Sequence, residues 1–592
     1  MAHEDVRVVI ARGTMGTDGF LFQRPETVLV ANQPSEVLQV LREVQRATDS
    51  GMCAAGFLAY EAGSGLDSAM LSHSAGDIPF PLAWFGIFRE AREIRIPDAD
   101  EGVGFSTGVW RPSMSAEQHA AAVGRIKDYL KSGDTYQVNF TFRLRTIFKG
   151  EPWSLFCRLQ RNQVARYSSF IETDRFAICS ASPELFFSLE GDALLSKPMK
   201  GTSRRGLTAL QDQELASRLQ SSAKQRAENV MIVDMVRNDM GRIAERNTVE
   251  ASHIYDVEQY PTVFQMISTV KCRTSADLPE IMKALFPCAS ITGAPKIRTM
   301  QIIRELESDP RGIYTGCVGY MLPGRLARFN VAIRTVAVNK QKGTAEYGVG
   351  GGIVWDSDAV DEYQECLVKS EVLTARRPCF DLLETILFEG AKGYFLLEEH
   401  LERLAGSAVY FGLQIDVNKI RKSLMEAAEA AGSATLKVRL LFSENGTVSV
   451  KSEPLSHPAT TRPWRLALSE TRVSPDSLYL YHKTTIRSVY DEARKAWPGY
   501  DDVILLNVRD EITESTIANV AIEKNGKVFT PPVTCGLLAG VFRNWLIRRG
   551  ELTERILTVG DILGADKLYL INSVRRWVPA ELDRGTCGDQ SG

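Results

Sequence analysis

The stretch GVGGGIVWDSDAVDEYQECLVKSEVL, residues 348–373, reads as a glycine-rich strand followed by a long amphipathic helix. The glycine cluster at 348–352 permits close approach of the backbone to a ligand, because glycine has no side chain. Glu362, Glu365 and Lys369 follow at i, i+3 and i+7, which puts two carboxylates and an ammonium on one helix face. Such a stripe is usually a solvated face of ion pairs, but beside a cleft the carboxylates could hold Mg²⁺.

A cationic stretch upstream, KPMKGTSRRG (197–206), contains a candidate nucleophile. Lys200 is followed by Arg204 and Arg205, and cationic neighbours together with partial burial lower the pKa of a lysine and free its lone pair. The alternative is a solvated basic turn, which composition alone favours.

A helix is predicted to begin at Ser222, which has the S-x-x-Q spacing of a capping box with Gln225. Glu228 lies within this helix, close to the apolar run that starts at Val230. A carboxylate on the buried side of a helix needs a cation, a metal or a ligand as its partner. The alternative is an ordinary surface glutamate near a helix start.

The overall composition excludes several classes of protein. The chain has 592 residues with 70 basic and 73 acidic side chains, so bulk charge gives no case for binding nucleic acid or an anionic membrane. No transmembrane helix or signal peptide is expected, because no apolar run approaches 18 residues and acids come early at the N-terminus. Ten scattered cysteines without C-x-x-C argue against a disulfide framework or a zinc site. We expect a large, soluble, cytoplasmic α/β enzyme.

Together with five further motifs, these stretches resemble the chorismate-utilising enzyme family. The further motifs are GDTYQVNFTF (133–142), SASPELFF (180–187), SITGAPKIRTM (290–300), YTGCVGY (314–320) and NVAIRT (330–335). The resemblance covers about 110–373, with a weaker N-terminal part that includes GFLAYEAG (56–63). It implies a two-layer α/β (α+β) fold with mainly antiparallel sheets, and a substrate with two carboxylates that is bound as its Mg²⁺ complex.

The resemblance also implies roles for individual residues. Glu228 and Glu365 would be the metal ligands, with Glu362 and Gln225 acting alongside them through water. The residues implied to bind the substrate's carboxylates or line its site are Thr202, Gly293, Ala294, Tyr314, Arg334, Gly350, Gly351, Gly352 and Lys369.

Lys200, in K-G-T, is similar to the aminodeoxychorismate synthase component I branch of this family, whereas anthranilate synthases have a small residue there. The implied mechanism is covalent: Lys200 attacks ring C2, the C4 hydroxyl leaves, and ammonia enters at C4 and expels the lysine. Gln265 stands where the family often has a histidine associated with pyruvate elimination, which fits a product that keeps its enolpyruvyl group. The sequence does not identify the residue that acts as general acid or base in the first half. Because no glutaminase-like motif is present, a separate glutamine amidotransferase subunit or free ammonia is implied.

A domain boundary is predicted at ARRPCF (375–380), where Pro378 bars continuation of the preceding helix. This predicts domains at 1–374 and 379–592. After the boundary the alternation restarts with a strand at 381–388, a turn, a strand at 394–397 and a helix at 398–410.

The second half contains YLYHKTTIRSVYDEARKA (479–496) with Lys483, a candidate for the lysine that binds pyridoxal phosphate. Such a lysine needs a partner for the pyridine nitrogen and a phosphate site. Glu514 is the candidate partner, and a helix start with an arginine would bind the phosphate. The phosphate candidates are Gly540, Val541, Phe542 and Arg403. Taken singly, each of these residues has an ordinary surface role as its alternative.

The sequence of residues 380–592 resembles the class IV aminotransferases, which have pyridoxal phosphate fold type IV. Within this class it most resembles the aminodeoxychorismate lyase subgroup. That subgroup implies that Lys483 removes the C4 proton and that pyruvate is eliminated to leave 4-aminobenzoate. Thr385, Asn572 and Ser573 are candidates for substrate contacts. Members of the class usually dimerise, so a homodimer is expected.

The combined hypothesis is a bifunctional enzyme that makes 4-aminobenzoate from chorismate for folate synthesis, with Mg²⁺ and pyridoxal phosphate. Three alternatives stay open at this point. The second half could be an amino-acid aminotransferase, the first half could be an anthranilate synthase, or one half could be an inactive docking module.

Overall fold

The glycine cluster lies on β21 (Thr344–Ile353), in an 11-stranded sheet of the first of two units. The computed structural model describes residues 6–13, 18–96, 104–375, 377–455 and 462–586. Unit 1 comprises Met1–Arg204 and Ala216–Arg377, and unit 2 comprises Arg205–Leu215 and Pro378–Gly592.

The 11-stranded sheet of unit 1 is antiparallel in every described pairing. Its order is β17 (Gly293–Ala294), β9 (Gln137–Gly150), β21, β20 (Thr335–Asn339), β11 (Phe176–Ser180), β10 (Ser169–Glu172), β1 (Arg7–Ala11), β2 (Asp18–Gln23) and β6 (Arg92–Arg95), with β7 (Phe105–Thr107) and β8 (Arg111–Pro112) on β9. The long pairing of β9 with β21 places Asn139 opposite Gly352.

A second antiparallel sheet of ten strands completes the unit. Its order is β14 (Met199–Arg204), β16 (Val263–Arg273), β13 (Ala193–Lys197), β12 (Leu185–Glu190), β19 (Leu326–Val331), β18 (Cys317–Leu322), β4 (Cys53–Leu58), β5 (Ala83–Phe88) and β3 (Thr27–Ala31), with β15 (Glu250–Gln259) on β16.

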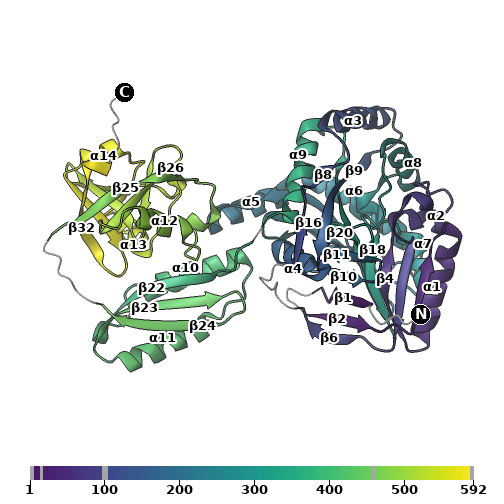
Figure 1. Cartoon of the computed structure of the whole chain (residues 1–592), viewed down its shortest axis with the longest axis horizontal. Helices are drawn as coiled ribbons and strands as arrows, with labels where there is room; N and C mark the ends of the chain where they lie inside the picture. The colour runs from purple at the N-terminus through teal and green to yellow at the C-terminus, as the bar shows by residue number, and fades with distance from the viewer. Residues whose placement is uncertain (1–5, 14–17, 97–103, 376, 456–461, 587–592) are drawn as a thin grey trace. The chain divides into compact units, whose positions relative to one another are not determined.

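Both faces of the first sheet are buried. Along β1, Val8 and Ile10 enter one hydrophobic core while Val9 and Ala11 enter another, as the two-residue period of a strand requires. The core that contains Val8 is shared with the second sheet. Helices α3 (Ala116–Lys131), α4 (Pro152–Gln163), α8 (Lys296–Leu306) and α9 (Ala359–Ser370) contribute to the other core, while α1 (Pro34–Asp49), α6 (Ala223–Gly241) and α7 (Leu278–Leu285) pack on the second sheet's core. Figure 1 shows α1 beside β4.

Unit 2 contains a three-stranded and an eight-stranded sheet. The first, β22 (Asp381–Glu389), β23 (Thr435–Ser443) and β24 (Val448–Pro454), packs with α10 (Leu397–Phe411) and α11 (Val417–Ala431) (Figure 1). The second runs β27 (Ile512–Ser515), β26 (Asp502–Asn507), β25 (Trp464–Val473), β32 (Arg576–Leu582), β31 (Lys567–Asn572), β28 (Asn519–Lys524), β29 (Lys527–Thr530) and β30 (Thr553–Glu554). Because β27 also pairs with β28, six of these strands close into a ring.

The fold confirms the predicted mixed α/β class with mainly antiparallel sheets. The predicted strand at 394–397 is wrong: Leu396 takes a φ of 53° and α10 begins at the next residue, so only Tyr394 makes an isolated bridge, to Phe388. The helix predicted at Ser222 is α6, and the Ser222 side chain accepts the Gln225 N–H at 3.4 Å.

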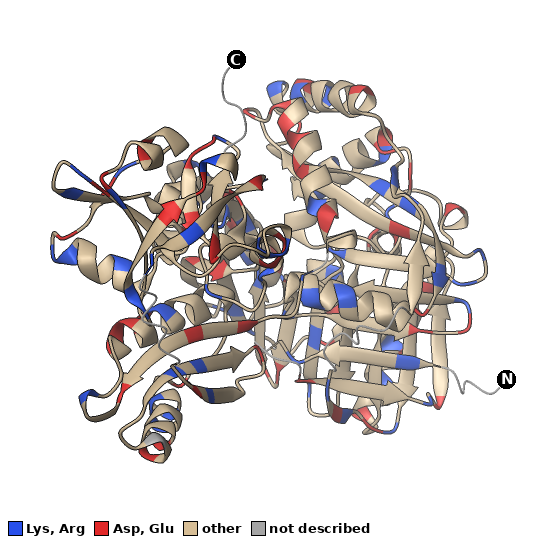
Figure 2. Cartoon of the chain, turned by 60° about the vertical axis from the view of Figure 1, so that its left-hand side comes forward, with Lys and Arg blue, Asp and Glu red and all other residues tan. Residues whose placement is uncertain are grey.

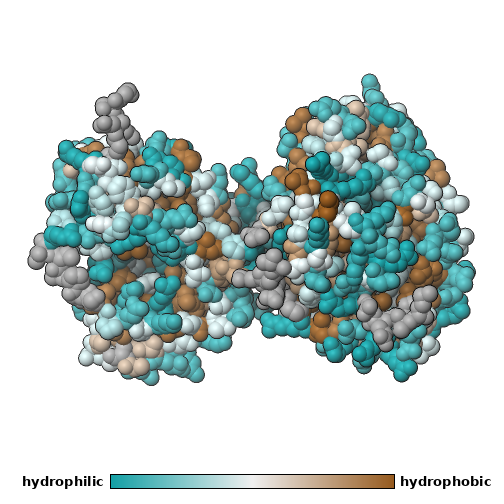
Figure 3. Space-filling model, viewed as in Figure 1, coloured by the Kyte–Doolittle hydropathy of each residue, from teal (hydrophilic) through white to brown (hydrophobic). Residues whose placement is uncertain are grey.

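The surface is mixed in charge and polarity. Figure 2 shows basic and acidic residues interspersed over the visible ribbon of both units. Figure 3 shows hydrophilic residues over most of the visible face, with hydrophobic residues in small groups. Among the helices that the structure describes, none is long and apolar enough to cross a membrane.

Candidate functional sites

Unit 1 contains a cavity of about 300 Å³ with walls from β14, α6, β21 and α9. Most of the residues singled out in the sequence line it. These are Lys200, Thr202, Gln225, Glu228, Gln265, Tyr314, Arg334, Gly350, Gly351, Gly352, Glu362, Glu365 and Lys369. Gly293 and Ala294, expected at the substrate site, do not line it; they form β17 and pair with Val138 and Gln137 of β9.

The Lys200 amine points at the backbone of β21. A Cβ atom built on Gly352 would lie 2.4 Å from Lys200 Nζ, so only glycine leaves room for the amine. Burial lowers the pKa of Lys200, the nearby carboxylate of Glu228 (Oε2 to Nζ, 4.0 Å) opposes this change, and Lys369 adds to it. The sequence argument named partial burial together with Arg204 and Arg205; burial is indeed the first cause of the lowering, but the cation that adds to it is Lys369. A lysine of lowered pKa supplies more neutral amine at neutral pH.

Helix α9 presents the predicted stripe to the cavity. Lys369 Nζ lies 2.6 Å from Glu365 Oε1 and donates to the Gly350 carbonyl at 3.0 Å. Burial would raise the pKa of Glu365, but Lys369 and Lys200 hold it below its usual value. Glu362 accepts a hydrogen bond from the Ser357 hydroxyl at 2.7 Å, and burial raises its pKa.

The acidic side chains suit a cation that takes only some ligands from the protein. Within the described ranges, no group of three or more His, Cys, Asp or Glu side chains is arranged to hold a metal. Glu228 on α6 and Glu365 on α9 nevertheless line one cavity. Gly351 leaves room beside them, since a Cβ there would lie 2.8 Å from Glu362 Oε2. Mg²⁺ commonly uses one or two carboxylates plus water and substrate oxygens, so this donor set fits it.

Tyr314 and Arg334 bring polar groups to the same cavity. The Tyr314 ring packs on Gly348, where a Cβ would lie 2.1 Å from the ring carbon Cγ. Arg334 has a positive φ of 53°, uncommon for a residue with a side chain, and its guanidinium donates to the Lys369 carbonyl. The cationic side chains of Arg334 and Lys369 and the phenol of Tyr314 therefore line the same cavity as the glutamate carboxylates.

Two residues at this site were missed by the sequence reasoning. Glu184, in the quoted motif SASPELFF, is buried, lines the cavity and accepts the Ser290 hydroxyl at 2.6 Å. Burial raises its pKa to about 7, against the lowering effect of Ser290 and Lys200. Gln137 has a buried side-chain amide without a hydrogen-bond partner among the described residues, 2.9 Å from the position of a Gly352 Cβ. The available signal was a polar residue inside an apolar run, which needs a partner when buried.

Unit 2 brings together the predicted cofactor residues. Lys483 lies before α12 (Ser488–Ala496), and burial, together with the charge of Arg403, lowers its pKa to about 8. Glu514 on β27 is also buried, which raises its pKa to about 7, and the charge of Lys483 opposes that rise. The two groups are thus close enough to affect one another electrostatically.

Glu514 is held by three donors that sequence reasoning did not identify. The Tyr490 hydroxyl donates to Glu514 Oε1 at 2.7 Å, and the Leu538 N–H donates to the same oxygen at 3.1 Å. Asn519 Nδ2 lies 3.3 Å from Oε2. A carboxylate fixed in this way can serve as the partner of a pyridine nitrogen.

The predicted phosphate residues meet at the start of α13 (Val541–Arg548). Gly540 is the N-cap, so the first N–H groups of the helix, including those of Val541 and Phe542, have no partner within it. Arg403 on α10 donates to the Ala539 carbonyl at 3.3 Å and pairs with the buried Glu384. A cavity of about 330 Å³ reaches Arg403 and Val541. An arginine beside free helix N–H groups, near a buried lysine and carboxylate, fits pyridoxal phosphate.

Comparison with known proteins matches the two parts of the chain to two family models. Residues 10–375 match the model for chorismate binding enzymes, and residues 381–582 match the model for class IV amino-transferases. Aminodeoxychorismate synthase component 1 of Klebsiella aerogenes is 40% identical over 265 residues, 44% of this chain and 58% of that protein. The protein of the same name from Escherichia coli (strain K12) is 38% identical over 270 residues, with the same coverage. The chain therefore spans less than two thirds of these curated relatives.

One solved structure supports the fold of unit 1. Anthranilate synthase component I from Streptococcus pneumoniae TIGR4 has a TM-score of 0.54 with 24% sequence identity, and the match covers 62% of this chain and 92% of that one. At this level of identity the likeness extends to the fold alone.

Proposed function

Since the chain belongs to the chorismate-binding enzyme family through residues 10–375, we propose that unit 1 converts chorismate and ammonia into 4-amino-4-deoxychorismate and water. Unit 2, matched by the class IV amino-transferase model, then eliminates pyruvate from that product to leave 4-aminobenzoate. The observation that carries the proposal is the Lys200 amine, buried against Gly352 in a cavity with cationic and carboxylate walls.

Substrate binding follows from the charges of the cavity. Arg334, Lys369 and the Tyr314 hydroxyl can bind the two carboxylates of chorismate through charge-assisted hydrogen bonds. Mg²⁺ held by Glu228 and Glu365 would neutralise and orient the substrate. Thr202 lies two residues from Lys200 on β14, and its hydroxyl donates to Gln265 Oε1 at 3.1 Å. Gln265 presents an amide at the position where the family often has a histidine.

The first reaction needs a nucleophile and a proton donor. Neutral Lys200 attacks C2 of the ring, and the C4 hydroxyl leaves as water when it receives a proton. Glu184 suits the donor's role, because its pKa of about 7 keeps a substantial protonated fraction at neutral pH. Ammonia then attacks C4 and expels Lys200, which restores the free amine. The unpaired Gln137 amide beside Gly352 can hydrogen-bond the incoming ammonia.

The second reaction removes a proton and pyruvate from the aminated ring. Pyridoxal phosphate bound in unit 2 would supply an electron sink for a substrate amine. Lys483, with its lowered pKa, can take the proton from ring C4. Glu514 would hold the pyridine nitrogen, and Arg403 with the α13 N–H groups would hold the phosphate.

The remaining parts of the proposal concern partners and context. No glutaminase-like motif accompanies the synthase residues, so ammonia would come from a separate amidotransferase subunit, as the component 1 designation of the relatives suggests. The proposed product, 4-aminobenzoate, suits a role in folate synthesis, and we propose a cytoplasmic location. A homodimer formed by unit 2 is the proposed assembly.

Two single-lysine variants test the division of labour. With chorismate, Mg²⁺ and ammonium, Lys483→Ala should accumulate 4-amino-4-deoxychorismate, because unit 1 is intact. Lys200→Ala should leave chorismate unconsumed yet still convert added 4-amino-4-deoxychorismate. Anthranilate from the wild type would refute the synthase assignment. Consumption of 4-amino-4-deoxychorismate only with an added 2-oxo acid, which would become an amino acid, would make unit 2 a transaminase.

A further inference from the structure

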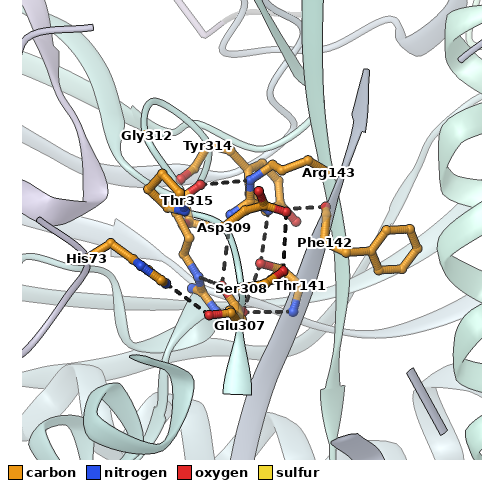
Figure 4. Close-up of polar contacts among 12 residues, drawn as sticks. His73, Thr141, Phe142, Arg143, Glu307, Ser308, Asp309, Gly312, Tyr314 and Thr315 are labelled. Carbon is orange, nitrogen blue, oxygen red and sulfur yellow. Dashed lines mark hydrogen bonds and ion pairs between the residues drawn. The ribbon is translucent and has the colours of Figure 1, made fainter. Parts of the chain in front are cut away.

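A cluster of buried charges lies behind the unit 1 cavity, and the proposed mechanism does not use it. We call Arg143, Arg311, Glu307 and Glu61 the buried arginine cluster. Each is at most 4% exposed. Figure 4 shows Arg143 and Tyr314 in the upper part of the cluster and Glu307 below them; Tyr314 lines the cavity. Burying four ionisable groups is costly, and such clusters add little stability compared with apolar packing.

Within this cluster Arg311 is fully paired. It donates to both carboxylate oxygens of Glu307, at 3.0 and 2.7 Å, and to the carbonyls of Ile291 and Asn139, at 2.8 and 2.6 Å. Ile291 and Asn139 both line the cavity. Glu61 accepts the backbone N–H groups of Arg311 and Gly312, at 2.7 and 3.0 Å. Arg311 therefore ties the cavity walls together and has a carboxylate to balance its charge.

Arg143 differs because its hydrogen bonds go to neutral acceptors. These are the carbonyls of Pro310 and Phe142 and the hydroxyl of Thr141, at 3.1 to 3.2 Å. The carboxylates of Glu307 and Glu346 come no closer to it than 3.9 Å. Its Nη2 atom is buried without a hydrogen-bond partner among the described residues.

Acidic groups surround Arg143, but none makes a close pair with it. Glu307 and Glu346 each lie 3.9 Å from its nitrogens, and its charge helps to hold the pKa of Asp309 below its usual value. The guanidinium is therefore fixed by carbonyls, a hydroxyl and its packing rather than by a close carboxylate.

The Arg143 guanidinium lies against a cavity residue. Its central carbon is 5.1 Å from the centroid of the Tyr314 ring, and the same ring packs on Gly348. Burial raises the pKa of the Tyr314 hydroxyl, while Arg143 and Arg311 oppose the rise and so make it a better hydrogen-bond donor.

We propose that Arg143 is a positioning residue of the synthase site: its guanidinium holds the Tyr314 ring against Gly348, so that the Tyr314 hydroxyl stays in place for a substrate carboxylate. This inference rests on the proposed function of unit 1. It assigns Arg143 to substrate binding in the ground state and transition state alike, which raises affinity without changing the chemical step.

The test compares Arg143→Met with Arg145→Met. Methionine keeps much of the side-chain volume and removes the charge. Arg145 lies two residues along β9, but its side chain is 48% exposed and pairs with Asp309 and Glu346, so solvent screens its charge. With saturating ammonium and Mg²⁺, Arg143→Met should raise KM for chorismate about tenfold or more, as the loss of one hydrogen bond from Tyr314 to a substrate carboxylate does, with kcat within about threefold. Arg145→Met should change KM less than about twofold.

Other results separate the possible failures. Equal KM values in the two variants, or a loss of kcat and thermal stability without a change in KM, would overturn the inference. If Arg143→Met does not fold, Arg143→Lys replaces it, because an ammonium can also lie over the Tyr314 ring: a near-wild-type KM supports the positioning role, and a tenfold rise contradicts it. Failure of the wild type to consume chorismate would refute the proposed function itself.

Discussion

Replacing Gly352 with alanine should disable the first reaction and leave the chain folded. The new Cβ would lie 2.4 Å from Lys200 Nζ and 2.9 Å from Gln137 Nε2. Carbon and nitrogen atoms pack at about 3.5 Å or more, so the lysine amine must move by about 1 Å. It can do so because it ends a flexible side chain. A misplacement of about 1 Å in a reacting group costs roughly 100-fold in rate. We therefore expect kcat to fall about 100-fold, with a stability loss of about 1–3 kcal/mol from overpacking.

The assay follows chorismate consumption with ammonium and Mg²⁺, beside thermal unfolding. Gly124→Ala is the matched control, since Gly124 lies in α3 and a Cβ there meets no atom within 4 Å. Conversion of added 4-amino-4-deoxychorismate reports on unit 2 and should not change in either variant. If Gly352→Ala kept more than about a third of the wild-type kcat, the Lys200 amine would not act from its place at Gly352.

Three further predictions concern single groups. Glu184 is protonated below its pKa of about 7 and ionised above it, so the rate of the first reaction should fall as pH rises through about 7. Glu184→Gln should lower kcat at least about 100-fold and abolish this pH dependence, whereas a variant that kept the dependence would exclude Glu184 as the proton donor. Glu365→Gln should raise the Mg²⁺ concentration for half-maximal activity about 10- to 100-fold, and an unchanged requirement would remove Glu365 from the metal site. Tyr490→Phe removes a hydrogen-bond donor to Glu514 and should weaken pyridoxal phosphate binding roughly tenfold, as measured by an absorbance titration. Unchanged binding would show that the remaining donors, such as the Leu538 N–H, are enough to hold Glu514.

Local patterns in the sequence predicted the helices and strands that carry the site. The stripe of Glu362, Glu365 and Lys369 needed only the helical period, and the α6 start needed only the cap at Ser222. The strand expected at 394–397 failed because the left-handed backbone of Leu396 is set by packing that periodicity does not report.

Long-range contacts account for what the sequence did not reveal. Gln137 meets the glycine cluster only because β9 pairs with β21 across some two hundred residues. The pKa of Lys200 depends on its burial, which the fold creates, and on Lys369, which is distant in sequence. Glu184 could have been suspected as a carboxylate in an apolar run, but its role needs the cavity wall and the Ser290 hydrogen bond.

The most direct test of the central claim is the fate of nitrogen in one reaction. Purified protein receives chorismate, Mg²⁺, pyridoxal phosphate and isotopically labelled ammonium, and the products are identified by mass. The account predicts labelled 4-aminobenzoate and an equal amount of pyruvate, with no other amino acid or 2-oxo acid added. Labelled anthranilate, or labelled 4-amino-4-deoxychorismate that persists without pyruvate, would contradict it.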